Sequence, residues 1–276
     1  MDSSAPIQPT TPLNGEKIVH FLFLHFVEDD TRSWKWMNRL RNALLAYYDI
    51  GSIEFFAIPS ENAHQSAQLE VWKFRTLHAD DASVLCVYYS GHGDLDDEGH
   101  LQLAAGPVPY RESKADSPDT DIPTVDWCHL QLDLIDCASD VLIIMDCCSA
   151  GAAVAPPDLG PPEPDGGATE FLLSCKRDED CYTGTDSFTG ILIRTLVDKA
   201  GDKTSFTIEE LCFWMARSVE ALRGITVHWQ TGPYRSTRVP IHEVVQKDSG
   251  LPIYLKPKDS EGRSSWKKED WSDDYY

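Results

Sequence analysis

Two stretches of the sequence decide the fold: Val84–Gly93 (VLCVYYSGHG) and Val141–Gly151 (VLIIMDCCSAG). Each begins with a continuous run of apolar, β-favouring residues, which is typical of a strand covered on both faces. Each ends in a glycine-containing segment with a reactive side chain, His92 in the first and Cys148 in the second. The ligand crevice of an open α/β sheet lies at the carboxyl ends of its strands, so neighbouring positions in the sheet would bring His92 and Cys148 together. A nearby histidine lowers the pKa of a cysteine thiol or accepts its proton, and the pair therefore predicts nucleophilic catalysis.

The rest of the chain alternates between strand-like and helix-like patterns. Further strands are expected at Ile18–Val27, Ile53–Ile58, Phe171–Leu173 and Ile225–Trp229. Between them, apolar residues recur at helical spacing in three segments, Trp34–Tyr48, Ala63–Leu77 and Trp127–Cys137. Two more helices are expected to begin at Ser187, as N-cap, and at a capping box formed by Thr207 and Glu210. This alternation predicts an α/β fold with a mostly parallel sheet.

The composition is that of one large globular domain with a strong excess of acidic residues. The 276 residues hold 24 Lys and Arg against 45 Asp and Glu, which gives a formal net charge of −21. Such a chain repels phosphate backbones and anionic lipids, so we expect no nucleic-acid and no membrane partner and favour cationic ligands. The eight cysteines include no C-x-x-C pair, and residues 1–15 lack the basic segment of a signal peptide. We therefore expect a reducing, cytoplasmic location, and we expect a monomer.

The two deciding stretches resemble the His-Gly and Cys blocks of the caspase-like cysteine peptidases. The segments concerned are YYSGHG (Tyr88–Gly93) and DCCSAG (Asp146–Gly151), and the closer likeness is to metacaspases, whose Cys block reads D-S-C-H-S-G. Leu172–Glu179 (LLSCKRDE) and Ser187–Leu196 (SFTGILIRTL) resemble the family's fifth-strand block and the helix after it. The resemblance implies a caspase-like fold, with a mostly parallel six-stranded sheet flanked by helices, over residues 16–255. Residues 1–15 would then be a disordered N-terminus and residues 256–276 a charged, mobile tail, in a form similar to fungal caspase-domain proteins.

The resemblance also implies an activity, that of a cysteine endopeptidase in regulated proteolysis or cell-death signalling. Cys148 would attack the scissile carbonyl, His92 would act as general base and acid, and the backbone amides of Gly93 and Cys148 would form the oxyanion hole. This chemistry requires no cofactor. Many metacaspases use calcium as an activator. The acidic run Asp94–Glu98 is therefore either a solvated loop or part of a calcium site, and the metal ligands are left open.

One position near the nucleophile points to the class of substrate. Caspases carry Gln two residues before the nucleophile, in a pocket that binds acidic side chains, whereas this chain has Asp146 there, as metacaspases do. A carboxylate would attract a guanidinium or ammonium group, so we expect cleavage after Arg or Lys in protein and peptide substrates, with Asp178 as a second pocket residue. The alternative is that Asp146 only caps the end of its strand, and that Arg235 and Arg238 build a pocket for acidic side chains.

Two departures from the family block leave a second function open. Ser149 and Ala150 stand where metacaspases have His and Ser, so the rival hypothesis is a catalytically silent, caspase-like signalling or scaffold module. The neighbouring cysteines receive no catalytic role. Cys147 is expected in the core, and Cys175 and Cys181 are expected as exposed thiols near a loop.

Overall fold

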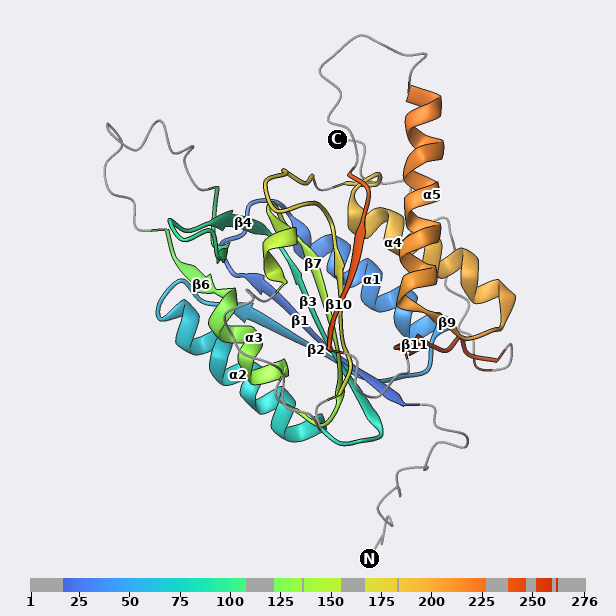
Figure 1. The fold of residues 1–276 in the computed structure, drawn as a ribbon, viewed down its shortest axis with the longest axis horizontal. Helices are drawn as coiled ribbons and strands as arrows, with labels where there is room; N and C mark the ends of the chain where they lie inside the picture. Colours follow the sequence, from blue (N-terminus) through green and yellow to red (C-terminus); the bar gives the residue numbers. More distant parts are fainter. Residues whose placement is uncertain are drawn as a thin grey trace, which may run out of the picture.

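The computed structural model describes residues 17–107, 122–135, 137–154, 167–182, 184–226, 238–246, 252–259 and 262. A sheet runs through the centre of the molecule, in the strand order β10-β8-β7-β3-β1-β2 (Figure 1). Its neighbours pair in parallel, except that the edge strand β10 runs antiparallel to β8. The strand bounds are Ile18–Phe26 (β1), Ile50–Ile58 (β2), Ser83–Ser90 (β3), Asp140–Asp146 (β7), Thr169–Leu173 (β8) and Ile241–Gln246 (β10). The prediction of a mostly parallel, six-stranded sheet is confirmed.

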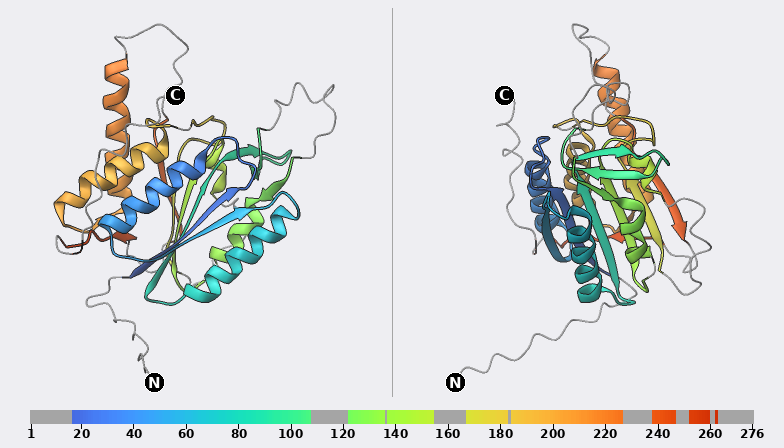
Figure 2. Two further views of the ribbon diagram at one scale, coloured as in Figure 1. Left: turned by 180° about the vertical axis from the view of Figure 1, so that it is seen from behind. Right: turned by 90° about the vertical axis from the view of Figure 1, so that its left-hand side faces the viewer.

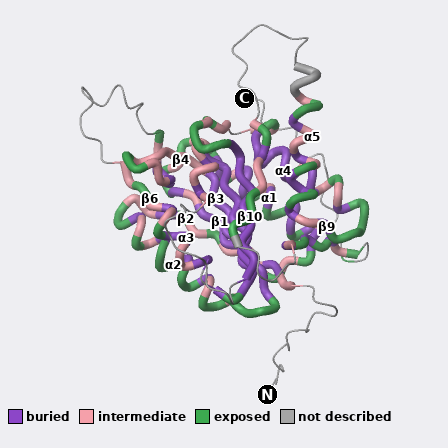
Figure 3. The backbone as a smooth tube through the Cα atoms, in the orientation of Figure 1, coloured by how far each residue is buried: buried purple, intermediate pink, exposed green. Residues whose placement is uncertain are grey.

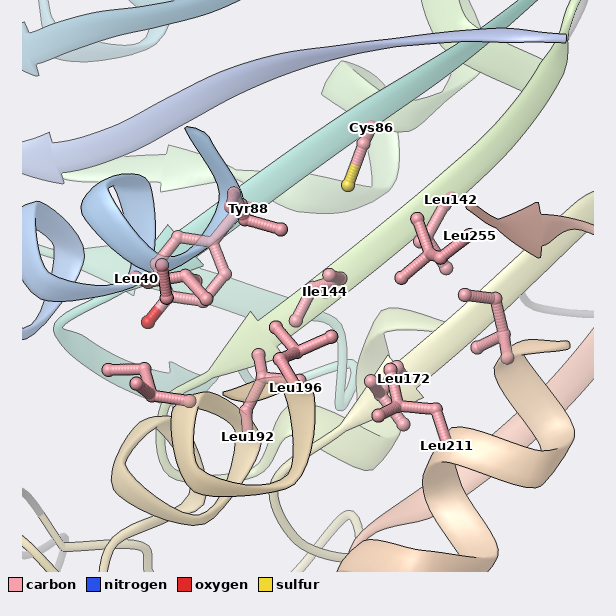
Figure 4. Packing of buried hydrophobic residues seen from close by; sticks show 14 of the residues in the cluster. Leu40, Cys86, Tyr88, Leu142, Ile144, Leu172, Leu192, Leu196, Leu211 and Leu255 are labelled. Carbon is pink, nitrogen blue, oxygen red and sulfur yellow. The ribbon is translucent and has the colours of Figure 1, made fainter. Parts of the chain in front are cut away.

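Helices cover both faces of this sheet (Figures 1 and 2). Three of them lie on one face: α1 (Ser33–Tyr47), α4 (Phe188–Lys199) and α5 (Ile208–Thr226). Two lie on the other: α2 (Ala63–His78) and α3 (Trp127–Ile135). Because side chains alternate along a strand, each strand contributes to two separate cores. Figure 4 shows part of the first core, where Ile144 of β7 lies near Leu192 and Leu196 of α4.

Burial explains why the deciding stretches form central strands. Every residue of β3 and of β7 is buried, and the strands in the middle of the sheet are coloured accordingly in Figure 3.

The expected helix starts are also confirmed. The Ser187 side chain accepts a hydrogen bond from the Gly190 amide at 3.3 Å. Thr207 and Glu210 exchange the two hydrogen bonds of a capping box, at 2.9 and 3.1 Å.

A second, three-stranded sheet stands beside the carboxyl edge of the main one, and the sequence patterns do not predict it. It consists of β4 (His92–Leu95), β5 (Leu101–Ala104) and β6 (Thr124–Asp126), in that order. The acidic run lies in the hairpin between β4 and β5. There, Asp96 accepts hydrogen bonds from the Glu98 and His100 amides at 2.9 and 2.8 Å and so closes the turn. His92 is consequently the first residue of a hairpin strand and not a loop residue.

The strand expected at Ile225–Trp229 is wrong where the structure describes it. Ile225 and Thr226 form the end of α5, because the apolar spacing of that helix continues through them, and residues 227–229 lie outside the described part. The sixth strand is β10, whose edge position tolerates the polar side chains that hide its pattern. A short pair of strands, β9 (Phe206–Thr207) and β11 (Tyr254–Leu255), closes the domain.

The first residues of the expected tail are attached to the domain. The Lys258 amide donates to the Tyr47 carbonyl at 2.7 Å, and the Asp49 amide donates to the Lys256 carbonyl at 3.0 Å. Residues 1–15 and most of the tail lie outside the described residues. Among the helices that the structure describes, none has the length and apolar character needed to cross a membrane.

Candidate active site

The two deciding strands are direct neighbours and end in step. In the parallel pairing of β3 with β7, Ser90 lies opposite Asp146, and the Gly91 amide donates to the Asp146 carbonyl at 3.3 Å. His92 and Cys148 each follow two residues later. The condition for bringing His92 and Cys148 together is therefore met, and both residues lie at the carboxyl edge of the sheet.

At Gly93 the β4–β5 hairpin packs closely against the segment that contains Cys147 and Cys148. A side-chain carbon at this position would lie 2.5 Å from the Cys148 carbonyl oxygen and 2.9 Å from the Cys147 Sγ, so only glycine fits. On the other side, the buried Tyr89 hydroxyl donates to the His92 carbonyl at 2.7 Å. The backbone at His92 is thus fixed from both sides against the segment that carries Cys148.

The imidazole of His92 has a carboxylate partner that the sequence analysis missed. Its Nε2 lies 2.6 Å from the Oδ1 of Asp30, in the loop after β1. The adjacent Asp29 also lies within 4.8 Å of these groups, but its carboxylate accepts hydrogen bonds from Thr31 and Ser33 at the start of α1. The sequence did contain a pattern that could have identified Asp30. Asp29 and Asp30 follow a buried strand just as His92 and Cys148 do, and parallel strands place all such residues at one edge.

The sulfur of Cys148 is partly exposed and hydrogen-bonded. The backbone amide of Cys181, in the loop after β8, donates to the Cys148 Sγ at 3.3 Å. Hydrogen bonding from the Cys181 thiol and amide lowers the pKa of Cys148 and outweighs the opposing effect of burial. A lowered pKa increases the fraction of nucleophilic thiolate at neutral pH.

The neighbouring cysteines have the opposite character. Cys147 is fully buried in the core beside α2 and α3, as expected, and burial raises the pKa of its thiol well above the ordinary value. The expectation that Cys175 is an exposed thiol is wrong, because its side chain is fully buried in the same core. Cys181 is partly buried against Cys148. Of the two adjacent cysteines, Cys148 is therefore the one that a substrate can reach.

The segment after the nucleophile is tightly packed. Ser149 adopts a left-handed backbone conformation (φ 57°), and its amide donates to the Glu179 carbonyl at 2.9 Å. A side-chain carbon at Gly151 would lie 2.6 Å from the Arg177 amide nitrogen, so the loop after β8 approaches the cysteine segment here as well.

Comparison of the structure with solved structures shows what fold this arrangement belongs to. The crystal structure of caspase-1 from Spodoptera frugiperda matches over 88% of this chain and 94% of its own, with a TM-score of 0.51 and 13% sequence identity. This is a caspase-like fold. A structure of the corresponding pro form, pro-sf-caspase-1, covers 88% of this chain and 96% of its own, with a TM-score of 0.45 and 12% identity. No protein-family model matches the sequence, and no curated protein does.

Within the caspase-like fold, Asp146 lies at the end of β7 and is almost fully buried. Its carboxylate accepts a hydrogen bond from the Thr189 hydroxyl of α4, and Thr189 also hydrogen-bonds the Tyr88 hydroxyl of β3. Burial raises the pKa of Asp146 to about 6, against the effect of the Thr189 and Ser90 hydrogen bonds. The carboxylate therefore lies inside the fold, two residues before the nucleophile in sequence, and joins β7 to α4.

The second predicted pocket residue, Asp178, is exposed on the loop after β8. Arg238 contacts the same loop, since its guanidinium donates to the Asp180 carbonyl at 3.2 Å and lies 3.9 Å from the Glu179 carboxylate. Arg235, the other cation of the alternative acid-binding pocket, lies outside the described residues. Asp178 and Arg238 thus lie at the loop after β8, whereas Asp146 is the buried last residue of β7.

Two groups of described residues hold three metal-binding side chains close together: Asp29, Asp30 and His92, and Asp96, Glu98 and His100. Calcium takes about six to eight oxygen ligands, whereas each of these groups offers two carboxylates and an imidazole. The Asp29 and Asp96 carboxylates, moreover, already accept hydrogen bonds within their own turns. Neither group fits a calcium shell, and activation by calcium stays a prediction.

Proposed function

We propose that this chain is a cysteine endopeptidase in which Cys148 is the nucleophile and His92 the general base and acid. The observation that carries the proposal is the placement of a partly exposed cysteine with a lowered pKa and a carboxylate-bound histidine on the ends of two adjacent strands. Nucleophilic cysteine catalysis needs these two groups, with the base oriented by a third.

The side chains support the following sequence of steps. The Cys148 thiolate attacks the scissile carbonyl carbon, and the oxyanion that forms is stabilised by the backbone amides of Gly93 and Cys148. The imidazolium of His92 then donates its proton to the leaving amine, which leaves a thioester on Cys148. His92 removes a proton from water, the hydroxide attacks the thioester, and the acid product leaves with the thiolate restored.

The bond to Asp30 assigns the two nitrogens of His92. A carboxylate oxygen accepts, so Nε2 carries the hydrogen in that bond. In the neutral ring, Nδ1 is then the unprotonated nitrogen and the one that receives the proton of Cys148. We therefore add Asp30 to the predicted Cys-His dyad as a positioning residue.

The proposed substrates are proteins and peptides with Arg or Lys before the cleaved bond. The buried carboxylate of Asp146, two residues before the nucleophile, supports this preference, because a guanidinium or ammonium group would neutralise it. The net charge of −21 adds a long-range attraction for cationic peptides that weakens with salt. Metacaspase-type activity in cell-death signalling, in a fungal cytoplasm, is the setting that we propose for it.

A peptidyl acyloxymethyl ketone with Arg at the first position tests the proposal against the silent scaffold. We expect labelling of the native chain that disappears in Cys148→Ala and persists in Cys147→Ala. A saturable rise in labelling on addition of calcium would support its role as an activator. No labelling at Cys148, with or without calcium, in a chain that remains folded would favour the scaffold.

A further inference from the structure

A second cysteine lies against the proposed nucleophile. Besides the 3.3 Å hydrogen bond from the Cys181 amide to the Cys148 Sγ, the Cys148 thiol lies 3.9 Å from the Cys181 carbonyl. The two thiols also interact with each other, which lowers the pKa of Cys148 and raises that of Cys181. The cysteines come from different segments, one after β7 and one after β8. They form a pair through the fold and not through adjacency in the sequence.

The loop that carries Cys181 is held in place on both sides of the pair. The Ser149 amide donates to the Glu179 carbonyl at 2.9 Å, and Arg238 donates to the Asp180 carbonyl at 3.2 Å. These bonds keep Cys181 beside Cys148 without a covalent link. A disulfide needs a sulfur–sulfur distance of about 2.0 Å, which from hydrogen-bonding contact requires a local shift of this loop and no rearrangement of the sheet.

The two thiols differ in reactivity in a complementary way. Cys148 is partly exposed and its pKa is lowered, so it is the more readily ionised thiol of the pair. Interaction with the Cys148 thiol, together with burial, raises the pKa of Cys181. Cys147 and Cys175 are fully buried, and burial raises the pKa of both. Oxidants react with accessible thiolates, and sensor cysteines are typically such thiolates next to a second cysteine that resolves them.

We propose that Cys148 and Cys181 form a peroxide-modification site, in which Cys148 is oxidised and Cys181 closes a reversible disulfide with it. The Cys148 thiolate attacks hydrogen peroxide, so that Cys148 becomes a sulfenic acid and hydroxide leaves. The Cys181 sulfur then attacks the Cys148 sulfur, the S–S bond forms, and the sulfenic oxygen leaves as water with the Cys181 proton. The hydroxide takes up a proton, so that two thiols and one peroxide give one disulfide and two waters.

The first step prepares the second. Interaction with the Cys148 thiolate raises the pKa of Cys181 and so favours its protonated form. Oxidation to the sulfenic acid removes that negative charge, so Cys181 ionises more readily when its partner has become electrophilic. The disulfide shields Cys148 from irreversible oxidation to the sulfinic acid and blocks it as a nucleophile until a thiol reduces it.

The experiment treats the purified native chain with a small excess of hydrogen peroxide and analyses it without reduction. Trypsin cleaves after Lys176 and Arg177, so Cys148 and Cys181 fall on different peptides. We expect a linked pair of these peptides, with fragmentation placing the bond between Cys148 and Cys181, and its complete loss on treatment with dithiothreitol. Peptides that stay separate while Cys148 is converted to sulfinic acid would overturn the proposal.

A matched pair of variants separates this site from general thiol oxidation. In Cys181→Ser we expect Cys148 to accumulate as a dimedone-reactive sulfenic acid and then as a sulfinic acid that dithiothreitol does not restore. In Cys128→Ser, which removes another partly exposed cysteine, on α3, we expect the disulfide to form as in the native chain. Equal, reversible protection of Cys148 in Cys181→Ser would contradict the proposal.

The test is independent of the proposed peptidase activity, because it measures only the state of the sulfur atoms. Formation of the disulfide in a chain that cleaves no peptide would uphold this site and reject the peptidase. Conversely, an active peptidase that loses Cys148 irreversibly to peroxide would uphold the peptidase and reject this site.

Discussion

The Nε2 of His92 lies 2.6 Å from the Oδ1 of Asp30, although the two residues are 62 positions apart in the chain. One follows β3 and the other follows β1, and these strands are neighbours in the sheet. The pair gives the imidazole a fixed orientation and places the hydrogen of the neutral ring on Nε2. The adjacent Asp29 bonds Thr31 and Ser33 instead, so substitution of Asp29 and of Asp30 should have different effects.

We expect Asp30→Asn to lower kcat/KM about tenfold, or ~1.4 kcal/mol, because Asp30 is largely exposed and its effect is screened. The control is Asp29→Asn, which should lower the melting temperature through the lost hydrogen bonds to Thr31 and Ser33. An unchanged kcat/KM in Asp30→Asn would remove Asp30 from the site.

Substitution of the two adjacent cysteines should give opposite results. Cys148→Ala should abolish peptidase activity and leave the melting temperature nearly unchanged. Cys147→Ala should keep most of the activity but destabilise the fold by about 1 kcal/mol, because Cys147 fills the core beside Gly93. Kinetics and thermal unfolding of both variants check this. A folded but inactive Cys147→Ala beside an active Cys148→Ala would reverse the assignment.

Loss of His92 should affect the rate and not the fold. We expect His92→Ala to reduce kcat by about a hundredfold or more, because general acid and base catalysis is lost, while circular dichroism stays native. The His92 side chain is only partly buried, and the hairpin there is held by the Tyr89 bond to the backbone. A cooperative loss of structure in this variant would count against a catalytic role.

We expect substrate preference to depend on the carboxylate of Asp146. Among matched reporter peptides, those ending in Arg or Lys should be cleaved faster than the one ending in Asp. Asp146→Asn should lose most of that preference. Arg238→Ala serves as the control for the alternative pocket and should leave the preference unchanged. A preference for Asp that disappears in Arg238→Ala would establish the acid-binding pocket instead.

The Asp146 carboxylate should also make the free energy of unfolding depend on pH. The pKa of Asp146 is raised from 3.8 to about 6, so the folded chain holds a proton between these pH values that the unfolded chain has lost. Its contribution to stability is present below about pH 4 and is lost as the pH rises through 6. Asp146→Asn should therefore match the native chain near pH 4 and exceed its free energy of unfolding by on the order of 3 kcal/mol above pH 6. Denaturant unfolding across this range tests it, and a constant difference between the two proteins would contradict the raised pKa.

Processing should follow from the distribution of basic residues. The segment Ala152–Ala168 contains no Lys or Arg, and the first basic residues after the nucleophile are Lys176 and Arg177. The backbone of Lys176 and Arg177 packs against Gly151, and this packing protects their peptide bonds from cleavage in the folded chain. We expect an active single chain, or slow cleavage at Lys176 or Arg177, as followed by mass spectrometry. Self-cleavage between Ala152 and Ala168 would refute specificity for basic residues.

The sequence alone determined the central strands, the helix starts and the placement of His92 and Cys148 at strand ends. These features depend on local information: apolar runs for buried strands, helical spacing for α1 to α3, and capping side chains for α4 and α5. That reactive groups gather at the carboxyl edge followed from a general rule for α/β sheets, whereas the adjacency of β3 and β7 was only a condition of that argument.

Only the tertiary structure decided which residues meet there. Asp30 became the partner of His92, and Cys181 the partner of Cys148, because each follows a strand whose place in the sheet no local pattern reveals. Cys175 is buried, six residues before the partly exposed Cys181, for the same reason. Contacts between distant segments depend on strand order and loop path, and these are set by the packing of the whole sheet between its helices.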